Sequence, residues 1–97
     1  MTEVEKAAIR QIKAASDILT EARKHTHMRE GVGGRWLGVC PMHGGRGFQV
    51  DRTPQTFHCF GCNAHGDVID LARLARGVSF NSALAILAAS AGVTLPP

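Results

Sequence analysis

Cysteine is scarce in this 97-residue sequence, and the few present come in an odd number. Three cysteines cannot pair off into a closed disulfide framework. The sequence also lacks an apolar run long enough to cross a membrane. Its first eight residues are charged rather than apolar, unlike a secretory signal. These absences argue against a secreted or membrane protein. We expect a cytoplasmic protein with no membrane partner, in a reducing compartment where paired cysteines usually bind metal.

Negative charge is also scarce in the middle of the chain. Residues 31–65 contain three arginines but a single acidic residue, Asp51, and no charge at all follows Arg76. The net charge of the whole chain, +3, favours a nucleic-acid partner only weakly. The distribution of charge along the chain is a stronger indication of such a partner, because it concentrates positive charge in one central segment.

All three cysteines belong to two short pairs, Cys40 with His43 and Cys59 with Cys62, in the pattern C-x2-H-x15-C-x2-C. Two residues between paired ligands let a tight turn direct both side chains at one ion, and the fifteen between the pairs can form a hairpin. Three thiolates and one imidazole complete the tetrahedral shell of Zn²⁺, whereas iron–sulfur clusters prefer four cysteines. The sequence therefore predicts one structural zinc, with no vacancy for a catalytic water.

Other histidines are alternatives to His43 by residue type alone: His25, His27, His58 and His65. The first two lie farther from the cysteine pairs than His43 does. The third directly precedes Cys59, which is too close for a knuckle pair, and use of the fourth would leave Cys40 without a paired ligand. Spacing therefore favours His43.

Hydrophobic periodicity predicts helices at both ends of the chain and strands between them. The predicted helices cover residues 2–24, 68–76 and 80–91, and the predicted strands cover residues 35–39, 48–50 and 56–60. Ser16-Asp17 is an N-cap signal that would divide the first helix in two. The last helix is apolar around much of its circumference, so it is either buried or docks onto another protein.

We expect one α+β zinc-ribbon domain, in which an antiparallel sheet with a zinc knuckle is flanked by N- and C-terminal helices. In this division, residues 1–30 are a helical leader, residues 31–66 form the zinc ribbon and residues 67–97 form two helices. Alternation along residues 56–60 places His58 and Phe60 on one face of the sheet, with Phe57 and Cys59 on the other.

Four stretches resemble the N-terminal zinc-binding domain of DnaG-type bacterial DNA primases: Trp36-Leu-Gly-Val-Cys-Pro-Met-His43, Phe48-Gln-Val50, Phe57-His-Cys-Phe-Gly-Cys62 and Ala64-His-Gly-Asp-Val-Ile-Asp70. The resemblance extends over nearly the whole chain. It departs in the zinc loop, where the family usually has Lys-Thr-Pro-Ser-Phe and this sequence has Arg46-Gly47-Phe48. The resemblance implies a zinc ribbon with the same four ligands. It also implies engagement of single-stranded template and selection of the primer start.

Primase chemistry in that family belongs to a separate acidic, metal-binding domain, and this sequence has no Asp-x-Asp pair. We therefore expect a module that binds single-stranded DNA and acts with a catalytic primase part or a helicase. Arginines would meet phosphates and aromatic rings would stack on bases. The residues predicted to do so are Arg46, Phe48, Arg52, His58 and Phe60. The alternative is a protein-interaction module that docks a replication or mobile-element protein through its apolar helices.

Overall fold

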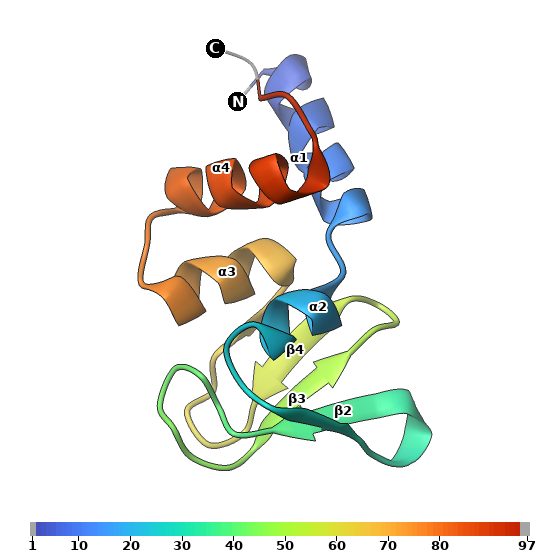
Figure 1. Ribbon diagram of the computed structural model, residues 1–97, viewed down its shortest axis with the longest axis vertical. Helices are drawn as coiled ribbons and strands as arrows, with labels where there is room; N and C mark the ends of the chain where they lie inside the picture. The colour runs from blue at the N-terminus through green and yellow to red at the C-terminus, as the bar shows by residue number, and fades with distance from the viewer. Residues whose placement is uncertain (1, 96–97) are drawn as a thin grey trace.

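The chain forms two helices, five strands and two further helices over residues 2–95, which the computed structural model describes (Figure 1). The helices are α1 (Glu3–Ala15), α2 (Ile18–Arg23), α3 (Val68–Arg76) and α4 (Phe80–Ala91). The strands are β1 (Met28–Glu30), β2 (Arg35–Gly38), β3 (Phe48–Asp51), β4 (Thr56–Cys59) and β5 (His65–Gly66). A 3-10 turn, Val32–Gly34, joins β1 to β2.

Local sequence sets the helix boundaries. Thr2 with Glu5, and Asp67 with Asp70, form capping boxes that begin α1 and α3. Asp17 caps α2 by accepting a hydrogen bond from the next turn, so the predicted break in the first helix is confirmed. Both α3 and α4 end at a glycine in the left-handed conformation, which relieves the last carbonyls of each helix.

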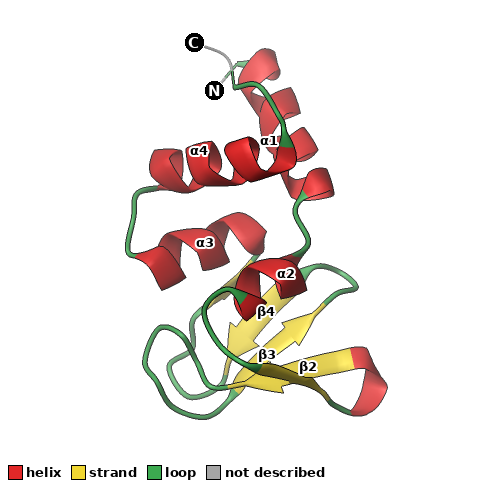
Figure 2. Ribbon diagram, viewed as in Figure 1, coloured by secondary structure: helices red, strands yellow, loops and turns green. Residues whose placement is uncertain are grey.

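The strands form one antiparallel sheet in the order β1-β2-β3-β4-β5, and the helices lie on one side of it (Figure 2). On β3 and β4 the side chains facing the helices are almost fully buried: Phe48, Val50, Phe57 and Cys59. The opposite face, called the outer face here, carries a row of directly paired residues that crosses all five strands. That row is Arg29, Leu37, Gln49, His58 and His65. The predicted alternation along β4 is confirmed.

The helices supply the rest of the core. α3 packs against both α2 and α4, and α1 packs against α4. α4 buries its apolar side, which is made of Ala83, Leu84, Leu87 and Ala88. The composition of this helix allowed either burial or docking onto another protein, and the structure shows burial. No single helix in the described residues is long and apolar enough to span a membrane. α3 and α4 pass such a test only as a pair, across a bend of 112°.

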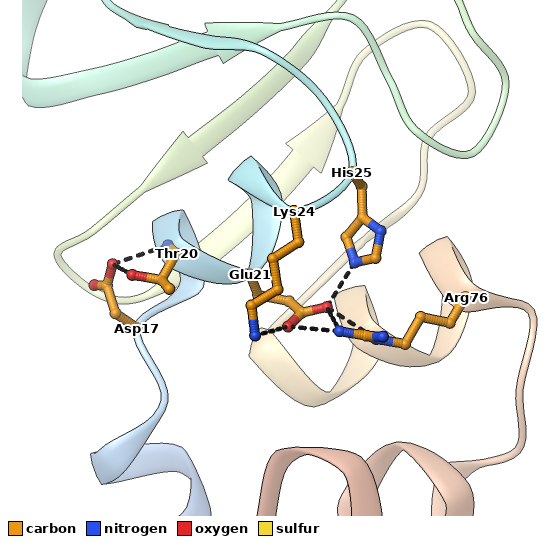
Figure 3. Close-up of polar contacts among 6 residues, drawn as sticks. All are labelled: Asp17, Thr20, Glu21, Lys24, His25 and Arg76. Carbon is orange, nitrogen blue, oxygen red and sulfur yellow. Dashed lines mark hydrogen bonds and ion pairs between the residues drawn. The ribbon is translucent and has the colours of Figure 1, made fainter. Parts of the chain in front are cut away.

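A buried ion cluster ties α2 to α3. Glu21 of α2 is only 2% exposed, and three cationic or ionisable side chains point at its carboxylate (Figure 3). Arg76 of α3 donates to it from Nε at 3.1 Å and from Nη2 at 3.3 Å. His25 Nε2 lies 2.6 Å from Oε2, and Lys24 Nζ lies 3.7 Å from Oε1. Nothing in the local sequence marks Glu21 as buried.

The structure corrects the predicted division at residues 28–30. Sequence analysis placed them in a helical leader, but Met28–Glu30 form strand β1 and pair with β2. Strand β5, at the opposite edge, was also missed. Both strands are too short to show an alternating pattern. They exist because a longer neighbouring strand supplies their hydrogen-bond partners.

Candidate metal centre and outer sheet face

Two turns at one end of the sheet bring the predicted ligands together. Cys40 follows β2 and Cys59 ends β4, so strand pairing through β3 fixes their relative position. His43 and Cys62 lie in the turns that follow. One potential ligand atom from each of the four residues lies within 4.8 Å of all the others. The buried Cys40 and Cys59 form the inner side of the group, and the other two are exposed.

Two distances test whether this group fits zinc. In a tetrahedral site with Zn–S near 2.3 Å and Zn–N near 2.0–2.1 Å, two sulfurs lie about 3.8 Å apart and a sulfur–nitrogen pair about 3.6 Å apart. The Sγ atoms of Cys40 and Cys62 lie 3.8 Å apart. His43 Nδ1 lies 3.7 Å from Cys59 Sγ. The donor set and its spacing therefore match those of a tetrahedral zinc site.

Glycine is required where the two turns approach each other. A Cβ on Gly61 would lie 2.5 Å from the carbonyl oxygen of Arg46 and 2.8 Å from His43 Nε2. Both distances are far shorter than ordinary contact. Asn63 then takes the left-handed conformation, with φ of 64°, as predicted for the residue where the chain leaves the knuckle.

The buried thiols differ in acidity. Burial raises the pKa of the Cys40 thiol. Burial alone would also raise the pKa of Cys59, but hydrogen bonds from the backbone N–H groups of Cys62 and Gly61 outweigh it, and the pKa of Cys59 is lowered. These N–H groups stabilise the thiolate that a metal needs. A cation at the centre would offset the desolvation of Cys40.

An aromatic pair stands on the outer face beside this centre. The rings of His58 and Phe60 are stacked, with centroids 4.3 Å apart and planes 13° apart. Phe60 is 66% exposed, and its backbone N–H donates to the carbonyl of Gly47 at 2.9 Å. Since Phe60 lies between Cys59 and Cys62, this hydrogen bond joins the second knuckle to the loop that follows the first.

Comparison with known proteins assigns the family. A family model described as CHC2 zinc finger matches residues 4–97. The chain belongs to the CHC2 zinc finger family. Membership confirms the predicted resemblance and, together with the four clustered residues, indicates one zinc ion.

Relatives of this CHC2 zinc finger include DNA primases. The chain is 34% identical over 94 residues to a DNA primase of Thermotoga maritima, covering 95% of this chain and 16% of the relative. It is 35% identical over 89 residues to a DNA primase of Geobacillus stearothermophilus, covering 90% and 15%. The crystal structure of the Aquifex aeolicus primase (zinc binding and RNA polymerase domains) matches with a TM-score of 0.83 and 30% identity, covering 92% of this chain and 22% of that one. The chain is thus a primase-type zinc-binding domain that spans about one sixth of the relatives it matches, and the predicted α+β fold is confirmed.

One predicted DNA contact in this CHC2 zinc finger is wrong. Phe48 is only 1% exposed, and its ring packs 6.0 Å from that of Phe57 on the helix side of the sheet. The reason is register: Phe48 pairs with Cys59, so both point to the buried face. The alternation along β4 places Phe48 on the buried face only once its pairing with Cys59 is known. The residue of β3 that reaches the outer face beside His58 is Gln49.

The two arginines predicted to contact DNA, Arg46 and Arg52, lie in different environments. Arg46 is exposed and makes no ion pair within residues 2–95. Arg52 lies in the β3–β4 turn, where its Nε donates to Asp17 Oδ1 at 3.3 Å. The predicted DNA contacts did not include Arg29 or Arg35, although Arg35 is one of the three arginines of residues 31–65. Both lie at outer-face positions, on β1 and β2, and are likewise unpaired among the described residues. Arg35 lies within the arginine-containing segment that the sequence marks, whereas the position of Arg29 depends on the pairing of β1 with β2, which no local pattern predicts.

Proposed function

We propose that this domain holds single-stranded DNA template on the outer face during primer synthesis, while a catalytic primase part outside this sequence performs the chemistry. The observation that carries the proposal is the exposed stack of Phe60 on His58. An aromatic side chain exposed in this way offers a platform on which a base can stack regardless of its identity.

Zinc has a structural role in this proposal. Cys40, His43, Cys59 and Cys62 hold the ion, which fixes both knuckles. Phe60 lies inside the second knuckle and is hydrogen-bonded to the loop that carries Arg46. The ion supplies no chemistry to DNA. It holds the backbone segments that carry Phe60 and Arg46 in one arrangement, so that these segments need not be ordered when template binds.

Unpaired positive charge on the outer face also supports the proposal. Arg46 and Arg35 are exposed and have no carboxylate partner within residues 2–95. Arg35 also lines a pocket of about 190 Å³ with Thr56, His58 and Phe60. Asp51 lines the same pocket but forms no ion pair with Arg35 within residues 2–95, so a phosphate entering there would meet a guanidinium that need not break an existing ion pair. Arg52 is less suited, because Asp17 already neutralises it.

The docking alternative has weaker support. α4 is the most apolar helix, but its apolar side is buried inside the domain, and its large exposed hydrophobic residue is Phe80, at 39%. A catalytic primase part or a helicase remains in the proposal as a partner, in the cytoplasm where bacterial replication proteins act.

The test compares two phenylalanines of the same protein. Phe60→Ala should weaken binding of a single-stranded oligonucleotide by about 1–3 kcal/mol, the usual loss for one stacked base. Phe80→Ala, on the helix side, should leave the affinity unchanged. Fluorescence anisotropy on zinc-loaded protein measures both, and binding must weaken as salt rises. Equal affinities for the two variants, or no salt-dependent binding by the wild type, would remove the proposal.

A further inference from the structure

A broad hollow opens on the outer face beside the zinc loop. Its volume is about 710 Å³, within the range of 300–1,000 Å³ that is usual for small-ligand sites. The walls come from the segment before β1, from β1 and β2, and from β3 with the loop that leads into it. They include His27, Arg29, Leu37, Val39, Arg46 and Gln49. Gln49 also lines the smaller pocket beside Phe60, so one side chain borders both hollows.

The chemistry of these walls suits an anion with a flat apolar body. Leu37 is half-buried and Val39 is 54% exposed, and together they offer apolar surface. The lining contains no acidic residue. Arg29 and Arg46 are both exposed, and over the described part of the chain neither guanidinium is engaged by a carboxylate or by any hydrogen bond. A nucleotide combines the required features, because its phosphate is anionic and its base is flat.

Gln49 lies where a base edge would be read. It sits between Leu37 and His58 in the row across the sheet. Its side-chain amide forms no hydrogen bond to another side chain or backbone group within residues 2–95. An amide presents one donor and one acceptor side by side, a pattern that pairs with N7 and N6 of adenine, whereas guanine offers two acceptors on that edge and the pyrimidines have no N7. At the usual spacing of about 4.8 Å between β-strands, the row is about 19 Å long. A single DNA strand that follows the row therefore passes Gln49 at its midpoint.

We propose that the 710 Å³ hollow is a nucleotide subsite for the template strand. Arg29 and Arg46 contact the phosphates on either side of one unstacked base, which lies against Leu37 and Val39. Gln49 reads the edge of that base and favours adenine. This inference rests on the proposed function, since the same strand continues to Phe60, and it adds where the template is read.

The experiment separates charge from readout. Labelled oligothymidylates with one central A, C, G or T are titrated with zinc-loaded protein at several salt concentrations. Arg29→Ala should weaken binding to all four equally and make the salt dependence shallower by about 0.7 in log–log slope. Gln49→Met should leave the slope unchanged but remove the preference for the central adenine. That preference should be about 5- to 150-fold in the wild type.

Two controls keep the result interpretable. Arg10→Ala removes an exposed arginine of α1 that also lacks an ion pair among the described residues, and it should change neither slope nor preference. Arg46→Ala repeats the charge test without touching the short strand β1. Zinc content and circular dichroism confirm that each variant is folded.

The outcomes distinguish this inference from the proposed function. If Phe60→Ala weakens binding while Arg29→Ala and Arg46→Ala behave like Arg10→Ala, the subsite is wrong, and template binding through Phe60 stands without a contribution from Arg46. A Gln49→Met variant that keeps the wild-type base preference, or a wild type with none, overturns the reading role. If the wild type binds no single-stranded DNA, both proposals fall.

Discussion

Replacing Glu21 by glutamine should cost this domain a large part of its stability. The carboxylate is 2% exposed and carries two hydrogen bonds from Arg76 and one contact with His25. Glu21→Gln keeps the size and removes the charge, so the half-buried guanidinium of Arg76 loses its counter-charge. Breaking a buried pair in this way costs about 3–5 kcal/mol. The side chain of Arg76 is 27% exposed and that of His25 is 15% exposed, so partial rehydration places the expected loss near the lower limit, about 3 kcal/mol.

The assay is urea unfolding at a fixed excess of free zinc, because bound metal contributes to the apparent stability. In a thermal melt under the same conditions, a loss of about 3 kcal/mol would lower the Tm of a domain of this size by about 12–24 °C. The matched control is Glu3→Gln. Glu3 lies 3.6 Å from Lys6 in a pair whose side chains are 85% and 51% exposed, and such a pair contributes about 0–1 kcal/mol.

A double variant tests the cause. Glu21→Met with Arg76→Met replaces the pair by apolar groups of similar length, and it should be more stable than Glu21→Gln alone, since no buried charge is left unpaired. The reasoning is refuted if Glu21→Gln costs no more than Glu3→Gln. It is also refuted if adding Arg76→Met gives no recovery, because the loss would then come from packing around α2.

Two further predictions concern metal and pH. Chelation of zinc, or Cys59→Ser, should abolish the cooperative thermal transition followed by circular dichroism, since metal binding supplies folding energy in small zinc domains; an unchanged melt after verified metal loss would contradict this. Burial alone would raise the pKa of Asp67, but the hydrogen bond from Lys13, at 2.9 Å, and the N–H of Asp70 lower it below its ordinary value of 3.8. A lowered folded pKa stabilises above the unfolded pKa and stops doing so as pH falls through the folded pKa. The stability difference between wild type and Asp67→Asn should therefore be constant from about pH 7 to about pH 5 and shrink below about pH 4, and a difference that grows with acid would show the sign to be wrong.

The sequence by itself determined the features that depend on a few neighbouring residues. Paired spacing selected Cys40, His43, Cys59 and Cys62, and the structure brings these four together. Cap residues set the limits of α3 and α4, which run from Val68 to Arg76 and from Phe80 to Ala91 as predicted. In each case the interaction closes within one turn of the chain, so the local pattern contains the information.

Only the tertiary structure decided which side chains are free to act. Phe48 turned inward because of its register with Cys59. Arg52 was neutralised by Asp17, a residue 35 positions away, and Glu21 was buried by an arginine 55 positions away. Arg29 lies on the outer face only because the three-residue strand β1 pairs with β2. Exposure and charge pairing are set by segments that meet after folding, and the physical reason is that burial and ion pairing depend on distance in space, which the order of residues along the chain does not specify.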